Sequence, residues 1–205
     1  MNSDFSIAID DQAIATITWD CEKKSMNVLS FEALETLEKL IDQVIEDKNI
    51  AGCILTSGKK DFAAGMDLNV LAQLKQSAGE NPAEGVFEGV MKMHSVLRKI
   101  ELAGMDPKTK KGGKPIVSVL PGTALGIGLE IPLSTHRIFA ANNSKAKIGL
   151  PEILIGLFPG AGGTTRLVRK LGAMAASTYL LEGKTVAPTK AHAAGIIDQV
   201  EENPM

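Results

Sequence analysis

The segments PGTALGIGLEIPL (121–133) and IGLPEILIGLFPGAGG (148–163) hold the features from which the fold and the site of this chain can be predicted. They begin where an apolar run typical of a buried strand, IVSVL (116–120), ends. Clustered glycines let the backbone approach a ligand closely, and N–H groups at a helix start favour negative charge. Glu130 and Glu152 follow on apolar segments, where two carboxylates can differ in pKa and divide into an acid and a base. The combination indicates acid–base chemistry, although packing or solvation explains any single glycine or glutamate more simply.

Length and composition exclude several classes of protein. The 205 residues suit one domain with a large core, and a net charge of −2 argues against an extended nucleic-acid-binding face. The one basic run, KTKKGGK (108–114), is interpreted as part of an exposed loop at 102–115. The two cysteines and three histidines show neither a disulfide framework nor metal-ligand spacing, so no metal is expected. The absence of a membrane-length apolar run and of a signal-peptide pattern favours a cytoplasmic protein.

The order of predicted elements is that of an α/β layered structure. Two apolar runs around Asp10-Asp11 predict a hairpin, Ser30 predicts the cap of a helix at 31–47, and 52–56 reads as a buried strand. This β-β-α-β order is typical of α/β folds. Further helices are expected at 67–75 (with Asp67 as its cap), 83–101, 129–136 (with Pro132 in its first turn), 162–171, 173–182 and 188–194, and further strands at 116–120, 137–140, 147–150 and 196–200. The methionines of the 83–101 helix are expected to lie in the core.

Motifs for several other chemistries are missing. The chain contains no G-x-S-x-G nucleophile turn, no G-x-x-x-x-G-K-[ST] phosphate loop and no G-x-G-x-x-G after a strand. Nucleotide-binding and serine-nucleophile functions are therefore disfavoured.

Three motifs, with the glycine-rich run before Glu130, carry a family resemblance. FAAGMDL (62–68), GLPEILIGLFPGAGGTTRL (149–167) and AHAAGIIDQV (191–200) resemble the crotonase, or enoyl-CoA hydratase/isomerase, superfamily from about residue 5 to 200. The 22-residue step between Glu130 and Glu152 looks most like the N-terminal hydratase portion of multifunctional fatty-acid oxidation proteins. The resemblance implies an α/β fold of the ClpP/crotonase type, a spiral of β-β-α repeats without the usual C-terminal helices. Residues 1–205 would then form a hydratase/isomerase core domain that is a fragment of a longer chain.

The resemblance also implies roles for five residues at the reacting centre. Two backbone N–H groups, of Met66 and Ile127, would hold the thioester oxygen of an acyl-CoA. Glu130 would position and activate water, and Glu152 would exchange a proton at the α-carbon. The backbone of Gly160 would help to hold the water. Hydration needs a base for water and an acid for carbon on one face, so the pair fits this chemistry.

Binding of coenzyme A is implied as well. Ala64, Met66 and Leu68 match a stretch that lines the adenine pocket, and Lys24 lies where a basic side chain meets the phosphates. No cofactor is expected beyond the CoA thioester itself, with NAD involved only if a dehydrogenase domain follows. The expected partners are further copies of the chain, or a thiolase in a β-oxidation complex.

The activity implied is hydration of 2-trans-enoyl-CoA to 3-hydroxyacyl-CoA in fatty-acid β-oxidation. Two alternatives stay open: a Δ3-Δ2-enoyl-CoA isomerase, which needs only one carboxylate, and a catalytically silent acyl-CoA-binding or scaffold subunit. The silent subunit is suggested by Ile127 and by the missing C-terminal helices. Ile127 replaces the middle of the three glycines usual in the family and would be strained if that position required a positive φ. An apolar face that includes Leu180, Leu181, Ile196 and Ile197 is expected to be partly bare and to promote self-association.

Overall fold

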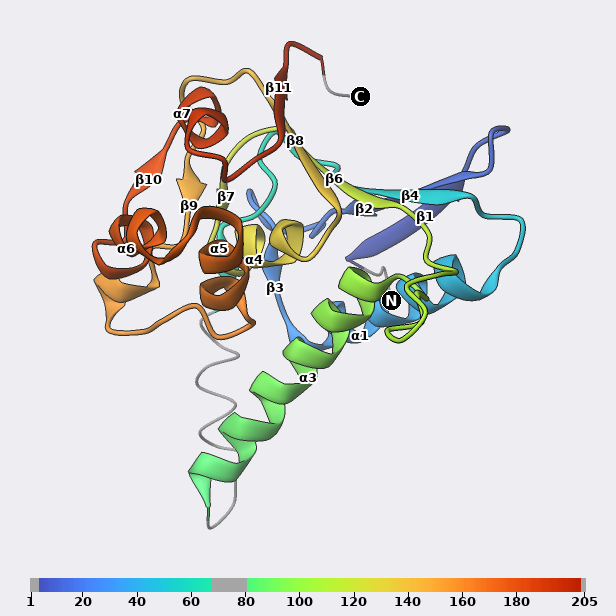
Figure 1. Ribbon diagram of the computed structural model, residues 1–205, viewed down its shortest axis with the longest axis horizontal. Coiled ribbons are helices and arrows are strands. Elements are labelled where there is room, and N and C mark those ends of the chain that lie inside the picture. The colour runs from blue at the N-terminus through green and yellow to red at the C-terminus, as the bar shows by residue number, and fades with distance from the viewer. Residues whose placement is uncertain (1–3, 68–80, 204–205) are drawn as a thin grey trace.

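The computed structural model describes residues 4–67 and 81–203 (Figure 1). The strands are β1 (Phe5–Ile9), β2 (Ile14–Trp19), β3 (Val28–Leu29), β4 (Gly52–Ser57), β5 (Gly65–Met66), β6 (Ile116–Leu120), β7 (Ala124–Leu125), β8 (Arg137–Ala141), β9 (Ile148–Gly149), β10 (Thr185–Val186) and β11 (Gln199–Glu201). The helices are α1 (Phe31–Glu46), α3 (Pro82–Leu102), α4 (Ile127–Leu133), the 3₁₀ helix η1 (Glu152–Ile155), α5 (Gly163–Leu171), α6 (Ala173–Leu181) and α7 (Pro188–Ala193). In this part of the chain, no helix is both long enough and apolar enough to cross a membrane.

A six-stranded sheet forms the centre of the molecule, in the order β1-β2-β4-β6-β8-β11. β1 and β2 make the predicted antiparallel hairpin, whose turn is held by the Asp10 carboxylate accepting the amides of Gln12 and Ile14. The strands from β2 to β11 pair in parallel. Parallel strands are covered on both faces, which explains the nearly continuous apolar sequences of β4 and β6.

Short strands follow the long ones and build a second layer. β3 pairs with β5, and β9 lies between β7 and β10. An isolated bridge between Ala63 and Ala124 joins the two small sheets. The chain therefore repeats strand, short strand and helix as β2-β3-α1, β4-β5-α3, β6-β7-α4 and β8-β9-α5, the predicted β-β-α spiral. This arrangement brings residues 63–66 beside residues 124–126.

Helices α1 and α3 pack together through apolar stripes and ion pairs. Ser30 caps α1 as predicted, because its Oγ accepts the amide of Ala33 at 3.1 Å. Glu38 on α1 forms ion pairs with both Lys92 and Lys99 on α3. Figure 1 shows α3 running past α1 and extending beyond the body of the molecule at its N-terminal end.

The loop between α3 and β6 supports α1 through one of its lysines. Lys114 donates from Nζ to the carbonyl oxygens of Val44 at 2.7 Å and Asp47 at 2.6 Å. These carbonyls lie at the C-terminal end of α1, where the last carbonyls have no partner within the helix and the last turn contains no basic residue. The basic run is therefore an exposed loop, as expected, except for Lys114, which caps a helix.

Two predicted elements have wrong boundaries. The helix expected at 129–136 is α4, which starts at Ile127 and ends at Leu133, so Pro132 lies near its end and not in its first turn. Gly126 allows the earlier start, because its φ of 57° turns the chain into the helix. The strand expected at 196–200 is β11, Gln199–Glu201. The helix expected at 67–75 lies outside the described residues except for Asp67.

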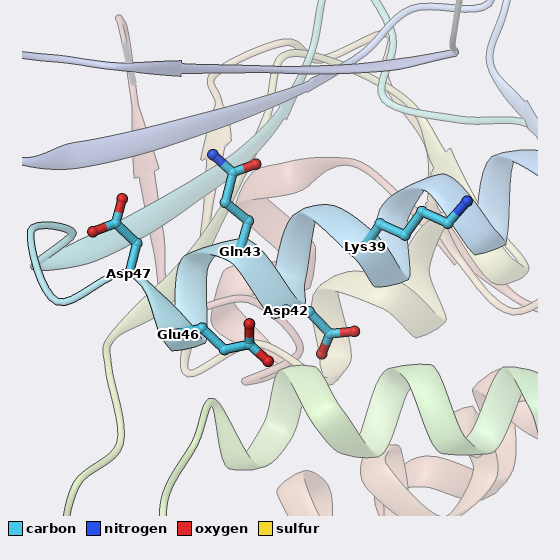
Figure 2. A pocket seen from close by; sticks show the side chains of 5 residues that line it. All are labelled: Lys39, Asp42, Gln43, Glu46 and Asp47. Atoms are coloured by element: carbon cyan, nitrogen blue, oxygen red, sulfur yellow. The ribbon is translucent and has the colours of Figure 1, made fainter.

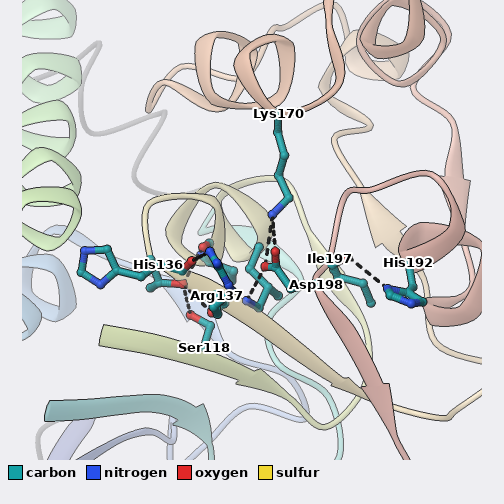
Figure 3. A network of polar contacts seen from close by, with 10 residues as sticks. Ser118, His136, Arg137, Lys170, His192, Ile197 and Asp198 are labelled. Atoms are coloured by element: carbon teal, nitrogen blue, oxygen red, sulfur yellow. Dashed lines mark hydrogen bonds and ion pairs between the residues drawn. The ribbon is translucent and has the colours of Figure 1, made fainter. Parts of the chain in front are cut away.

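The expectation of a bare apolar face at Ile196 and Ile197 is wrong, since both side chains are buried in the core. Polar contacts hold this C-terminal segment against the sheet (Figure 3). The Asp198 carboxylate accepts the amide of Ile138 on β8 at 2.8 Å and forms an ion pair with Lys170 on α5. Leu181, by contrast, is exposed as expected, and Leu180 is partly buried against the core.

Candidate active site

A mostly apolar pocket of about 470 Å³ lies where α3, β5, the start of α4, η1 and the turn after η1 meet. Its lining residues are Ala64, Gly65, Met66, Val86, Val90, Met93, Gly126, Ile127, Glu130, Pro151, Glu152, Leu154, Ile155, Leu157, Phe158, Gly160 and Ala161. A concave apolar pocket with a few convergent polar groups is the usual form of a small-molecule site.

A second depression, of about 640 Å³, is shallow and lies on α1 (Figure 2). It is lined by Lys39, Asp42, Gln43, Glu46 and Asp47, which are polar side chains of one helix and its C-terminal cap. It offers no apolar wall for a ligand, so the 470 Å³ pocket is the candidate active site.

Glu130 points from α4 into a cage of backbone amides. Its side chain is only 3% exposed, and its Oε1 accepts the N–H groups of Ala161 at 2.9 Å and Gly163 at 2.8 Å. A Cβ at position 163 would stand 2.7 Å from the Glu130 Cγ, so only glycine leaves space for this carboxylate. Gly163 also starts α5, and N–H groups at a helix start favour a negative charge.

The surroundings of Glu130 favour its protonated form in spite of these amides. Burial raises the pKa of Glu130 to about 7, and the nearby Glu152 carboxylate adds to the rise. The amides of Gly163 and Ala161 and the guanidinium of Arg166 act in the opposite direction on this pKa. Glu130 can therefore exchange protons near neutral pH.

Glu152 enters the pocket from the first residue of η1, directly after Pro151. Its Oε2 is buried and has no hydrogen-bond partner among the residues that the structure describes. Burial raises the pKa of this carboxyl group too. Gly126 lies opposite, since a Cβ there would be 3.3 Å from the Glu152 Oε1. Two carboxyl groups with raised pKa values thus face one apolar cavity.

The two predicted oxyanion donors border the same pocket. Ile127 is the first residue of α4, and an N–H at this position has no acceptor within the helix. Met66 ends β5, and the two backbones are close, because a Cβ at Gly126 would lie 3.8 Å from the Cα of Gly65. The β5 strand and the α4 start therefore bring both peptide groups to one end of the cavity.

The strain considered for Ile127 is absent. The positive φ lies one residue earlier, at Gly126, and the non-glycine residues with positive φ in the described part of the chain are Ala13, Ala103 and Lys110. The Ile127 side chain is 4% exposed and belongs to the hydrophobic core. A β-branched residue is therefore compatible with the backbone here.

The predicted CoA-binding residues are only partly brought together. Ala64 and Met66 line the pocket, whereas Lys24 is not among the lining residues and forms an ion pair with Asp67. Leu68 lies outside the described residues. The role of Lys24 at a CoA phosphate stays a prediction. In the described part of the chain, no group of three or more His, Cys, Asp or Glu side chains could hold a metal ion.

Several residues of the site were not identified from the sequence. The amides of Ala161 and Gly163, which hold Glu130, come from the glycine-rich turn, where the family resemblance implies a role only for Gly160. Val86, Val90 and Met93 of α3 form a wall of the pocket. Met93 was expected in the core, and it is both buried and in contact with the cavity. The same expectation is wrong for Met91, whose side chain is 48% exposed. The repeated glycines at 160, 162 and 163 were the available signal for the amide cage.

Comparison with known proteins shows the family of this chain. The sequence profile of the enoyl-CoA hydratase/isomerase family matches residues 10–203. The fatty acid oxidation complex subunit alpha of Shewanella oneidensis is 32% identical over 201 residues, which are 98% of this chain and 26% of that protein. The protein of the same name from Shewanella amazonensis is 32% identical over 203 residues, with the same coverage. The chain thus spans about a quarter of the length of these curated relatives.

Solved structures show the same fold. The enoyl-CoA hydratase of Bacillus anthracis superposes with a TM-score of 0.81 at 28% identity, covering 97% of this chain and 70% of that one. A protein from Geobacillus kaustophilus described as an enoyl-CoA hydratase superposes with a TM-score of 0.82 at 26% identity, covering 98% and 69%. The fold is the crotonase fold, and since the family profile matches nearly the whole chain, this chain belongs to the enoyl-CoA hydratase/isomerase family.

Proposed function

We propose that this chain adds water across the C2–C3 double bond of a 2-trans-enoyl-CoA thioester, as a step of fatty-acid oxidation. The observation that carries the proposal is the pair Glu130 and Glu152, which face one apolar pocket and both have raised carboxyl pKa values. Paired carboxyl groups whose environments perturb their pKa values are typical of acid–base sites.

In the proposed reaction Glu130 acts as the base. Its Oε1 is held by two amides, which leaves its other oxygen able to accept a proton from water. The water oxygen then bonds to C3, and the electron pair of the double bond moves toward the thioester oxygen. The Glu130 carboxylate can take this proton because its pKa lies near 7.

Glu152 completes the addition as the acid. Its Oε2, which has no hydrogen-bond partner in the described part of the chain, provides a carboxyl group that can deliver a proton to C2. The electron pair returns from the thioester oxygen to C2 as that C–H bond forms. The N–H groups of Ile127 and Met66 would stabilise the negative charge on the thioester oxygen in between, and one such donor contributes about 3 kcal/mol.

The wider role follows the named relatives. Proteins called fatty acid oxidation complex subunit alpha are similar to this chain over its length, and the chain matches 26% of theirs. We therefore propose that the chain works in fatty-acid β-oxidation, with NAD required only where a dehydrogenase part belongs to the same polypeptide. Self-assembly and association with a thiolase stay predictions.

Hydration of crotonyl-CoA by the full-length protein tests the proposal, followed by loss of the ultraviolet absorbance of the conjugated thioester. Each of Glu130→Gln and Glu152→Gln should lower kcat by about 10² to 10⁴, because each removes one proton-transfer group. Binding of the CoA thioester should change by only a few-fold. Glu22→Gln, at an exposed carboxylate, is the matched control.

Three outcomes separate the alternatives. Hydration near the wild-type rate in either active-site variant would contradict the paired mechanism. Conversion of a 3-enoyl-CoA without any hydration of crotonyl-CoA would identify an isomerase. Tight thioester binding with no turnover of either substrate would identify a silent binding subunit.

A further inference from the structure

Arg166 lies on α5 behind the turn that holds Glu130, and its charge is mostly buried. Its side chain is 10% exposed. Its guanidinium donates from Nη1 to the carbonyl oxygen of Ala161 at 3.0 Å and reaches the Glu101 Oε2 from Nη2 at 3.3 Å. A guanidinium presents its N–H donors in a rigid plane, so one side chain can reach both acceptors with a fixed geometry.

The carbonyl that Arg166 holds is placed between the two amides that bind the catalytic carboxylate. Along the backbone, the Ala161 N–H comes first, then the Ala161 carbonyl, then the Gly163 N–H. Both of these N–H groups donate to the Glu130 Oε1. A contact that fixes the carbonyl therefore fixes the peptide groups on either side of it.

The turn is shaped to admit this guanidinium. A Cβ at Gly162 would lie 2.5 Å from the Arg166 Nη1, which is a collision. Gly162 also has a φ of 94°, a conformation that other residues rarely adopt. Both the space and the backbone conformation at this position depend on glycine.

Arg166 also connects the turn with α3. Glu101, its carboxylate partner, lies near the C-terminal end of α3 and forms a second ion pair with Arg98 at 2.8 Å. The same helix supplies Val90 and Met93 to the pocket wall. A chain of contacts thus runs from the pocket wall on α3 through Glu101 and Arg166 to the amides around Glu130.

We propose that Arg166 is a positioning residue for Glu130: it braces the amide cage against α3 and supplies a positive charge that favours the ionised carboxylate. The proposal rests on the proposed function, because it assumes that Glu130 is the base. The arginine does not line the pocket, so it acts through the turn and through its electric field. Its charge opposes the effect of burial on the pKa of Glu130.

Three variants in the full-length protein separate these effects. Arg166→Gln removes both the charge and the planar guanidinium. Arg166→Lys keeps the charge but cannot bridge Ala161 and Glu101 in the same way. Arg98→Gln is the matched control, since Arg98 pairs with the same Glu101 and, among the described residues, makes no hydrogen bond to the turn.

Two readouts are needed. The first is the infrared titration of the Glu130 carboxyl band, which is assigned by its loss in Glu130→Gln. This titration distinguishes Glu130 from the neighbouring titratable groups Glu152, Glu101 and His94. The second is the pH dependence of kcat and KM for crotonyl-CoA. An opposite charge a few ångströms away moves a carboxyl pKa by about one unit or more, so half a unit is a conservative threshold.

Arg166→Gln should move the Glu130 titration upward by at least about half a pH unit and shift the kinetic pH profile in the same direction. It should lower kcat about tenfold or more with a smaller effect on KM, because the group affected is the base and not the binding wall. Arg166→Lys should titrate close to wild type and still lose kcat. Arg98→Gln should match wild type in both readouts.

An unchanged Glu130 titration together with wild-type kcat in Arg166→Gln would overturn the inference. If that variant does not fold, Arg166→Lys decides, since a wild-type kcat there would exclude a bracing role. Absence of hydration by the wild type would defeat the proposed function alone, because the infrared titration still reports whether Arg166 controls the ionisation of Glu130.

Discussion

At the scale of single residues, Ile127 combines a structural and a catalytic assignment. Its side chain is buried in the core, and its peptide N–H starts α4 at the edge of the pocket. Gly126 takes the positive φ that a β-branched residue would tolerate poorly. Burial of the Ile127 side chain is therefore compatible with the proposed role of its backbone N–H as an oxyanion donor.

Ile127→Ala should lower the free energy of unfolding by about 2–4 kcal/mol, because it removes buried methyl groups and leaves a cavity. Chemical denaturation measures this loss. Ile9→Ala, at a half-exposed position on β1, should cost less than about 1 kcal/mol. A gain in kcat/KM of about a hundredfold in Ile127→Ala would contradict the geometry, since it would mean that the side chain crowds the thioester.

Glu130 should make the protein less stable as the pH rises. Its pKa is about 7 in the folded protein, above the ordinary value of 4.5. The folded state therefore holds more protons than the unfolded state between these values, and stability falls as the pH rises through them. The difference corresponds to about 3 kcal/mol when the group is fully ionised.

Glu130→Gln should accordingly be more stable than wild type by up to about 3 kcal/mol at pH 8, and similar to wild type at pH 4. Glutamine keeps an oxygen that can accept the amides of Ala161 and Gly163. Denaturation curves at the two pH values measure the effect, with Glu22→Gln as the control. If the stability difference between Glu130→Gln and wild type were the same at pH 4 and pH 8, burial would not destabilise the ionised form of Glu130.

At the scale of elements, the C-terminal end of α1 is capped by a lysine that belongs to another part of the chain. Lys114 belongs to the loop between α3 and β6, far from α1 in the sequence. Its ammonium group nevertheless lies at the last carbonyls of α1. A positive charge at this end also interacts favourably with the helix dipole. The loop after α3 is therefore anchored at this point.

Lys114→Ala should reduce stability by about 1–2 kcal/mol, because two carbonyls lose a charged donor. Thermal and denaturant unfolding would detect the loss. Lys111→Ala, in the same loop and with an exposed side chain, should be neutral within about 0.5 kcal/mol. Equal effects of the two substitutions would show that the contacts of Lys114 do not contribute.

At the scale of the whole molecule, exposed apolar side chains of η1, of the segment after η1 and of α6 form an apolar face. Its members are Ile153, Leu154, Ile155, Leu157, Phe158, Met174 and Leu181, and Phe158 is 76% exposed. η1 and α6 contact each other near Gly183, where a Cβ would meet the Leu154 and Ile153 side chains. Large continuous apolar faces usually mark contacts with other protein surfaces.

We expect this chain to self-associate through that face as its concentration increases. Leu181→Glu should weaken the association, because it places a charge on the apolar surface outside the pocket. Sedimentation velocity over a concentration series measures the effect, with Ile9→Glu as the control on a different apolar side chain. A single monomeric species at high concentration would contradict the prediction.

The sequence by itself determined the class of fold and most of the elements. Local signals were enough for this: the Ser30 cap, the apolar periodicity of α1 and α3, and the alternation around Asp10 each depend on neighbouring residues. The family resemblance also predicts Glu130, Glu152, Met66 and Ile127 as residues of the site. The structure then brought all four to one cavity.

Only the tertiary structure decided which contacts hold Glu130 and how they shift its pKa. Glu130 is held by amides 31 and 33 residues later in the chain, and no local pattern encodes that contact. The burial that raises its pKa, the opposing charge of Arg166 and the start of α4 at Ile127 all depend on elements packed around the cavity. Periodicity and caps reflect interactions over a few residues, whereas desolvation and electrostatic coupling depend on what surrounds a group in three dimensions.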